Sequence, residues 1–341
     1  MSTQITTSSK TSSKTVPDIY DFINSIQDIT GWVSLTEAFG YVFRPTHKTR
    51  EELLTEFEQY WRKTHASILR KVSAKSGSFG IDIGCGNGQL LESAQKKQIE
   101  MVGLTLSPAQ AKYGISNGLT VRVMPYTDPS FLKMYKGKAD FVTLVGSVEH
   151  FTNPYLLAKQ ERAHPGDKEL QLRLRTDIYK EMFRIISGVL KPKGKVYISC
   201  CAFNSVHPTP TEIIRNPIHG LLTGGIDGFH STLLQRVLYG YYPDKDMLAS
   251  CAKELGFALV EAEDGTKDYY QTSRYWWYLL YHALAHHPLQ IAGRAVSFFA
   301  RSPYHAWITL VNTITGSWPW QFRSRKQGSP VILERLVFQK K

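Results

Sequence analysis

The stretch IDIGCGNGQ, residues 81–89, decides the fold of this chain. A short apolar run carries Asp82 near its end; Gly84, Gly86 and Gly88 follow, and a helix is expected to begin at about Gln89. Glycine lets a backbone turn sharply and approach a ligand closely, and the free N–H groups of a helix start point at that ligand. The spacing G-x-G-x-G differs from the dinucleotide pattern G-x-G-x-x-G, and a carboxylate beside the loop suits a cationic ligand. We therefore expect a cofactor loop here rather than only a tight turn.

Short apolar runs alternate with helical stretches on both sides of this loop. Such alternation indicates a parallel, doubly wound sheet with helices on both faces. We predict an α/β, Rossmann-like fold with a seven-stranded, mostly parallel sheet, N-terminal helices and a helical insertion before the last strand. The strands are expected at 79–83, 100–106, 119–124, 139–146, 194–203, 257–263 and 331–339.

Composition divides the chain into five parts. The polar, Ser/Thr-rich start has no apolar stretch of the kind found in signal peptides, and its composition predicts disorder. A helical pattern precedes the glycine loop, and an aromatic-rich helical pattern precedes the last strand. The predicted parts are a disordered tail (1–17), an N-terminal helical cap (18–75), a cofactor-binding core (76–264), an aromatic helical insertion that caps the substrate (265–330) and a final strand of the core (331–341).

Charge and cysteine content restrict the partners. The 341 residues carry a formal net charge of +12, which favours an anionic partner such as a phospholipid headgroup or a phosphorylated or carboxylated substrate. The basic residues are scattered, so nucleic acid is not expected. Four cysteines without CxxC spacing indicate neither a zinc site nor a disulfide framework and fit a reducing cytoplasm. His282 and His286 lack a third ligand nearby, so no metal is predicted.

A second informative stretch is VGSVEHF, residues 145–151. It reads as the end of a buried strand that runs into Glu149 and His150. Without a functional role, Glu149 would be a buried acid that caps the next helix or pairs with a cation, and His150 would pack in the core and hydrogen-bond to the backbone. The functional interpretation is a carboxylate at the ligand edge of the sheet, where desolvation raises its pKa towards neutrality and makes it a usable base.

The glycine loop resembles the first motif of S-adenosylmethionine-dependent methyltransferases of class I. The segment VGLTLSPAQ, 102–110, resembles the pattern GxTxSxxQ of one subgroup, the cyclopropane-fatty-acid synthases and mycolic acid methyltransferases. VGSVEHF resembles the VGMFEHV segment of that subgroup, and DYYQTSRYWW, 268–277, resembles its HYxxTLxxW segment. VLKPKGKVYI, 189–198, and VILERLVFQ, 331–339, resemble its LKPGG turn and closing strand. The similarity runs from about residue 36 to the C-terminus.

The resemblance implies S-adenosyl-L-methionine as cofactor. Many methyltransferases hold the ribose with an acid after the second strand, whereas this chain has Leu104 and Thr105 there. Ser107 is expected as an N-cap, with Gln110 completing a capping box. The cofactor residues that we expect are Asp82, Gly84, Gly86, Gly88, Leu104, Thr105, Gln110, Tyr126 and Gly146.

The family joins a methyl group to the double bond of a lipid chain through a carbocation, and a bound bicarbonate takes the proton. In that family the residues that hold the bicarbonate include a cysteine, a glutamate, a histidine and a tyrosine. Glu149 and Tyr269 match the glutamate and the tyrosine, but the cysteine position falls near Phe39 and the histidine position near Ser199. A bicarbonate site and cyclopropane formation are therefore in doubt, and Glu149 would act directly as base or orienter. The resemblance implies Glu149, Tyr269 and His150 as catalytic residues and Phe39, Tyr41, Ser199 and Trp276 as substrate contacts.

The aromatic stretch from Tyr269 to Trp307 supports an apolar acceptor. Aromatic faces stabilise a nearby carbocation without attacking it, and Trp and Tyr also suit a membrane interface. An ordinary hydrophobic core of inserted helices explains the stretch equally well. We expect a C-methyltransferase acting on an alkene of an apolar lipid or isoprenoid-like acceptor that carries an anionic head, in the cytoplasm or at a membrane periphery. An O- or N-methyltransferase of a natural product and an inactive lipid-binding protein are the alternatives.

Overall fold

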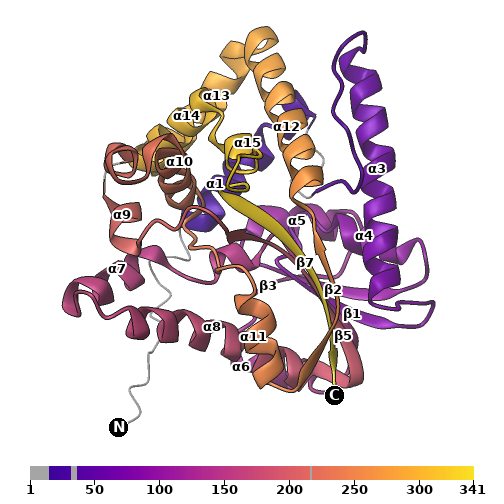
Figure 1. The fold of residues 1–341 in the computed structure, drawn as a ribbon. Coiled ribbons are helices and arrows are strands. Elements are labelled where there is room, and N and C mark those ends of the chain that lie inside the picture. The colour runs from indigo at the N-terminus through magenta and orange to yellow at the C-terminus, as the bar shows by residue number, and fades with distance from the viewer. Residues whose placement is uncertain (1–14, 32–36, 216) are drawn as a thin grey trace.

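The computed structural model describes residues 15–31, 37–215 and 217–341. Within them a seven-stranded sheet has the order β3-β2-β1-β4-β5-β7-β6 (Figure 1). Strands β1 to β5 pair in parallel, and β7 runs antiparallel to both β5 and β6, so the predicted mostly parallel α/β sheet is confirmed. The strands are β1 (Phe79–Ile83), β2 (Glu100–Thr105), β3 (Val121–Val123), β4 (Ala139–Val145), β5 (Leu190–Phe203), β6 (Phe257–Asp264) and β7 (Val331–Lys340).

Helices cover both faces of the sheet. Because a parallel sheet is buried on both sides, its central strands carry almost uninterrupted apolar residues, as β4 and β5 do. One face packs against α6 (Pro129–Tyr135), α8 (Lys168–Val189) and α11 (Met247–Glu254). The other packs against α3 (Arg50–Lys71), α4 (Gln89–Gln95) and α5 (Pro108–Ser116).

The remaining helices gather beyond the carboxyl ends of the parallel strands (Figure 1). The chain leaves β1 for β2 and β3 on one side and returns to β4 on the other, so the switch point of the topology lies between β1 and β4. Ligands of open α/β sheets bind at such a point. The helices are α1 (Thr15–Ser25), α2 (Gln27–Thr30), the 3₁₀ turn η2 (Val148–His150), α7 (Pro154–Ala163), α9 (Pro210–Ile214), α10 (Pro217–Leu238), α12 (Thr266–His286), α13 (Pro288–Arg301), α14 (Pro303–Thr315) and α15 (Ser317–Gln321).

The start of the chain differs in part from the expectation. Helix α1 begins at Thr15, so residues 15–17, expected in a disordered tail, are helical. The rest of that expectation, residues 1–14, lies outside the described residues. The rest of α1 lies in the part expected to be an N-terminal helical cap (18–75), and its apolar side chains pack on α10, α13 and α14.

Candidate active site

The glycine loop adopts a backbone that other residues rarely tolerate. Gly84, Gly86 and Gly88 have φ values of 82°, 55° and 84°, in the left-handed region. A Cβ on Gly84 would lie 2.4 Å from that of Ser147, and a Cβ on Gly88 would lie 2.7 Å from Leu119. The glycines therefore keep the loop flat against the carboxyl end of β1, and α4 starts directly after it.

Asp82 lies just beneath this loop. It is buried, and its Oδ1 accepts a hydrogen bond of 2.7 Å from the Thr143 hydroxyl of the neighbouring strand β4. Burial raises the pKa of Asp82 to about 7. A cation bound against the loop would favour the ionised form of this carboxyl group, so its position fits a sulfonium- or ammonium-bearing cofactor.

The turn after β2 corrects one detail of the sequence analysis. Ser107 caps α5 and accepts from the Gln110 N–H, but the Gln110 side chain does not close a capping box. Its Oε1 instead accepts from the Thr105 hydroxyl at 2.7 Å, and that hydroxyl also accepts from the Ser107 N–H. The Leu104 carbonyl accepts from the N–H groups of Gly84 and of the next residue, which ties the two loops together.

Helix α1 covers this region, a feature that the sequence analysis missed. The Ser107 hydroxyl donates to Asp21 at 2.6 Å, and the Asn87 side chain donates to Asn24 at 3.3 Å and to Gln27 at 3.2 Å. Within the described residues, Oδ1 of Asn87 and Nδ2 of Asn24 are buried without a hydrogen-bond partner. An unused acceptor and an unused donor beside the glycine loop fit a polar cofactor there.

Glu149 stands at the carboxyl end of β4, on the other side of the switch point. It is buried, and its Oε1 accepts from the Cys201 N–H at 2.7 Å. Its Oε2 is buried with no hydrogen-bond partner in the described part of the chain. Burial raises the pKa of Glu149 to about 7. Gly240 packs directly on its backbone, since a Cβ there would lie 2.1 Å from the Glu149 carbonyl oxygen.

Both ring nitrogens of His150 are occupied. Nδ1 lies 2.8 Å from the Leu238 carbonyl oxygen, and Nε2 lies 2.8 Å from the Tyr20 hydroxyl. Burial lowers the pKa of His150 to about 4, so the ring is neutral near pH 7. Because a carbonyl only accepts, Nδ1 carries the proton and Nε2 accepts from Tyr20. This geometry fits a residue that positions Tyr20 beside Glu149.

Tyr269 begins the aromatic stretch and lies close to Glu149. Its ring packs edge-on against Trp276 and Phe322, at centroid distances of 5.7 and 4.8 Å. Burial raises its pKa, and the nearby Cys201 and Glu149 raise it further, which places the hydroxyl within electrostatic reach of Glu149. Tyr269 is therefore neutral, a state in which it donates a hydrogen bond.

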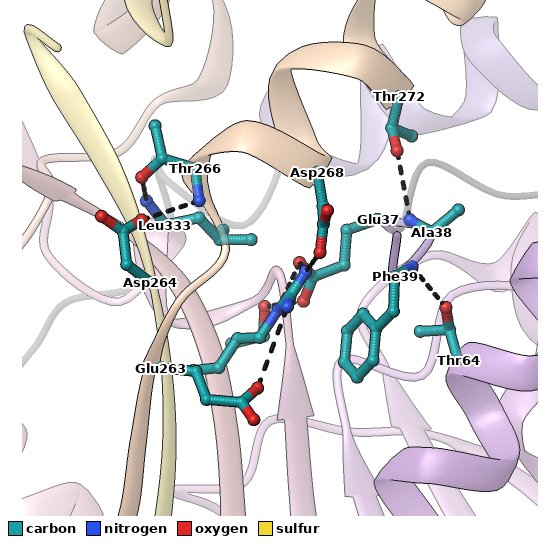
Figure 2. A network of polar contacts seen from close by, with 12 residues as sticks. Glu37, Ala38, Phe39, Thr64, Glu263, Asp264, Thr266, Asp268, Thr272 and Leu333 are labelled. Carbon is teal, nitrogen blue, oxygen red and sulfur yellow. Dashed lines mark hydrogen bonds and ion pairs between the residues drawn. The ribbon is translucent and has the colours of Figure 1, made fainter. Parts of the chain in front are cut away.

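Ser199 and Phe39 surround a buried ion cluster rather than an open pocket. The Ser199 hydroxyl donates to Glu37 at 2.6 Å, and Arg335 donates to Glu37 at 2.9 and 2.7 Å and to Asp268 at 2.7 Å. The Phe39 ring lies 3.8 Å from the guanidinium carbon. Figure 2 shows Glu37 and Asp268 converging on this group from different segments. The cluster was not foreseen from the sequence.

The same region anchors the segment before α3. The Ala38 N–H donates to the hydroxyl of Thr272, and the Phe39 N–H donates to that of Thr64 (Figure 2). Thr272 matches the threonine of the HYxxTLxxW segment, and its hydroxyl is the group that accepts from the Ala38 N–H. Tyr41 is fully buried and packs edge-on against Phe57 and Tyr275, away from Glu149.

Two further expected cofactor residues lie near the end of β4. Tyr126 follows β3 and stacks on Phe151 at a centroid distance of 4.6 Å. Gly146 has a φ of 63°, and its N–H donates to the Ser199 carbonyl at 2.8 Å. Among the described residues, no other atom would lie within 4 Å of a Cβ on Gly146, so they leave space beside it.

An apolar cavity of about 170 Å³ lies between α1, α10 and helices α12–α15. Its lining is almost entirely aliphatic and aromatic. Tyr20, Leu238 and Trp276 line it, and these residues also contact His150 or Tyr269. The cavity therefore ends beside the residues that surround Glu149, which suits an apolar acceptor.

Comparison with known proteins agrees with this architecture. A family model described as mycolic acid cyclopropane synthetase matches residues 50–299. No curated protein matches the sequence. The chain is similar to the cyclopropane synthase MmaA2 from Mycobacterium tuberculosis, with 17% identity, a TM-score of 0.60, and coverage of 96% of this chain and 98% of that one. It is also similar to a geranyl diphosphate methyltransferase, solved with GPP and sinefungin, with 12% identity, a TM-score of 0.57, and coverage of 97% and 100%.

The matched region spans most of the chain and contains both the glycine loop and Glu149. The carboxyl ends of β1 and β4 bring these two features together at the switch point of the sheet. The chain therefore belongs to the mycolic acid cyclopropane synthetase family and is a methyltransferase that uses S-adenosylmethionine.

Proposed function

We propose that the chain transfers a methyl group to an alkene carbon of an apolar, lipid or isoprenoid-like acceptor, with Glu149 as the base. The proposal rests on the buried Oε2 of Glu149, which has no hydrogen-bond partner among the described residues. The adjacent His150 contacts Tyr20 and Leu238, and both of these residues line the apolar cavity. Similar folds include a cyclopropane synthase solved with CTAB and the geranyl diphosphate methyltransferase solved with GPP, and both of these bound molecules have an apolar chain and a charged head.

The cofactor would lie across the carboxyl ends of β1, β2 and β4. The residues that would hold it are Asp82, Gly84, Gly86, Gly88, Leu104, Thr105, Gln110, Tyr126 and Gly146, with Asn24 and Asn87 added by the structure. Bound there, S-adenosylmethionine supplies an electrophilic methyl group. The carboxyl group of Asp82 would balance its positive charge, and α1 would exclude water from this side.

The chain's own residues would then handle the cation left on the acceptor. The carbon next to the newly methylated one is positively charged, and the faces of Tyr269 and Trp276 would stabilise it without reacting. Oε2 of Glu149 would take a proton from an adjacent carbon, and the C–H electron pair would form the new double bond. A pKa of about 7 makes this carboxyl group a competent base near neutral pH.

The ion cluster supports methylation rather than cyclopropane formation. The family's histidine and cysteine positions fall at Ser199 and Phe39, and both face the Arg335–Glu37 pair. The Ser199 hydroxyl already donates its proton to Glu37, and the Phe39 ring has no hydrogen-bond donor, so neither side chain offers a donor to a free anion. We therefore propose that the proton goes to Glu149 directly.

Isothermal titration with S-adenosylmethionine, followed by transfer of labelled methyl groups into lipid and polar extracts, tests the proposal. We expect cofactor binding and label in the lipid fraction. Label confined to polar compounds would indicate O- or N-methyl transfer instead. Cofactor binding without transfer to either extract would indicate a lipid-binding protein, and no binding at millimolar cofactor would refute the proposal altogether.

A further inference from the structure

Helices α13 and α14 present an unusual outward surface. Leu289 and Val296 of α13 are 86% and 66% exposed, and Trp307 and Ile314 of α14 are 57% and 70% exposed. The spacing of these residues places them in one stripe along each helix. Figure 1 shows both helices at the outer edge of the insertion. Adjoining apolar side chains on the surface commonly mark an interaction site.

This surface is continuous with the apolar cavity. Phe299 of α13 and Leu310 of α14 line the cavity and are also 37% and 40% exposed. They therefore lie where the cavity reaches the surface. We name the six residues together the α13–α14 face; they are Leu289, Val296, Phe299, Trp307, Leu310 and Ile314. An acceptor that entered between the two helices would pass from the apolar α13–α14 face into the apolar cavity.

The charge of the surrounding sequence is one-sided. Residues 269–330 contain six Lys or Arg residues and no Asp or Glu. Arg294 forms an ion pair with Asp28, but Arg301, at the end of α13, is exposed with its guanidinium bonded only to a backbone carbonyl within the described residues. Arg294 and Arg301 are the charged residues of α13, and α14 has no Lys, Arg, Asp or Glu, so the only formal charges of the two helices are positive and complement an anionic lipid surface. Trp307 and Tyr304 are of the types that prefer the level of the headgroups.

We infer that the α13–α14 face docks on anionic phospholipid bilayers and that the cavity opens towards the membrane. No helix of the described residues is long and apolar enough to cross a bilayer, so the helices would lie in its surface. This docking goes beyond the proposed chemistry and does not depend on it.

Co-sedimentation with vesicles tests the inference. The full chain is mixed with vesicles of phosphatidylcholine alone or of phosphatidylcholine with phosphatidylglycerol. The test variant is Val296→Glu/Ile314→Glu, because neither residue lines the cavity. The control is Tyr113→Glu/Ile115→Glu on α5, which places the same two charges on side chains that are 53% and 57% exposed on another surface. Thermal unfolding and cofactor titration of each variant establish that the fold is retained.

We expect the wild-type chain and Tyr113→Glu/Ile115→Glu to sediment with the anionic vesicles, less so at high salt, and Val296→Glu/Ile314→Glu to bind about tenfold more weakly or worse. The inference is overturned if the wild type does not bind, if it binds both vesicle types equally, or if the double variant binds like the wild type. It is also overturned if sedimentation velocity shows that the α13–α14 face joins two copies of the chain. Because the double variant should still methylate a detergent-dispersed acceptor, failure of docking is distinguishable from failure of the proposed chemistry.

Discussion

Replacing Glu149 by Gln should change the pH dependence of stability as well as abolish methyl transfer. The folded chain raises the pKa of this carboxyl group from 4.5 to about 7 because it is fully buried. The folded state thus binds a proton more tightly than the unfolded state. Ionisation of Glu149 destabilises the fold progressively as the pH rises from the unfolded pKa to the folded one, and the penalty is complete above about pH 7.

The magnitude follows from the two pKa values. Between about pH 5 and about pH 8.5, proton linkage through Glu149 removes roughly 2–3 kcal/mol from the free energy of unfolding. Glu149→Gln cannot ionise at this position, so its free energy of unfolding should fall by roughly 2–3 kcal/mol less over the same range. Because each variant is compared with itself at two pH values, any pH-independent effect of the amide side chain on the free energy of unfolding cancels. Urea unfolding at the two pH values measures the difference.

Glu334→Gln is the matched control. Glu334 of β7 is also buried, with a pKa raised to about 7 by burial, one oxygen bonded to the Asp246 N–H and one without a partner among the described residues. Glu334 lies opposite Cys200 in the pairing of β5 with β7. Because side chains alternate between the two faces of a sheet, Glu334 lies on the same face as Cys200 and on the opposite face from Cys201. Both variants should therefore show the same stability effect, but only Glu149→Gln should lose methyl transfer. Equal pH dependence of stability in the wild type and Glu149→Gln would refute the reasoning.

Three further perturbations test other parts of the structure. Arg335→Met leaves Glu37 buried without its cation and should lower the free energy of unfolding by about 3–5 kcal/mol in urea titrations. Ala306→Phe reduces the apolar cavity and should raise the KM for the acceptor about tenfold while leaving the calorimetric Kd for cofactor unchanged. Gly84→Ala and Gly118→Ala each place an alanine in the left-handed region, at a cost of roughly 1–2 kcal/mol. Only Gly84→Ala also contacts Ser147, so only this variant should weaken cofactor binding in the calorimetric titration.

The sheet and the cofactor loop were predictable because their signals are local. Each strand is a short apolar run, and the loop after β1 needs residues that tolerate positive φ, which only the glycines at 84, 86 and 88 supply. Glu149 was found in the same way, since it ends an apolar run on a charge. These features depend on residues that are neighbours in the sequence, so they can be predicted from a single sequence.

The contacts that complete the site join distant residues and left no comparable signal. Arg335 and Glu37 are separated by 298 positions, and their pairing depends on β7 lying beside β5. Gln110 matched a capping box in sequence, but its side chain accepts from the Thr105 hydroxyl, and the Ser107 N–H donates to that hydroxyl instead of to Gln110. Asn24 was overlooked because its helix follows a polar start, although its polar face repeats at a helical spacing with Asp21.

Methyl transfer from S-adenosylmethionine bearing a trideuterated methyl group tests the central claim most directly. The wild-type chain is incubated with lipid and isoprenoid alkenes, and the products are analysed by mass spectrometry. The account predicts a product that keeps every deuterium atom of the methyl group, on a carbon of the former alkene, and no product with Glu149→Gln. A product that has lost a deuterium would show that the proton had left the transferred methyl group, as it does when a cyclopropane ring closes. That result, label on oxygen or nitrogen, or full activity of Glu149→Gln would contradict the account.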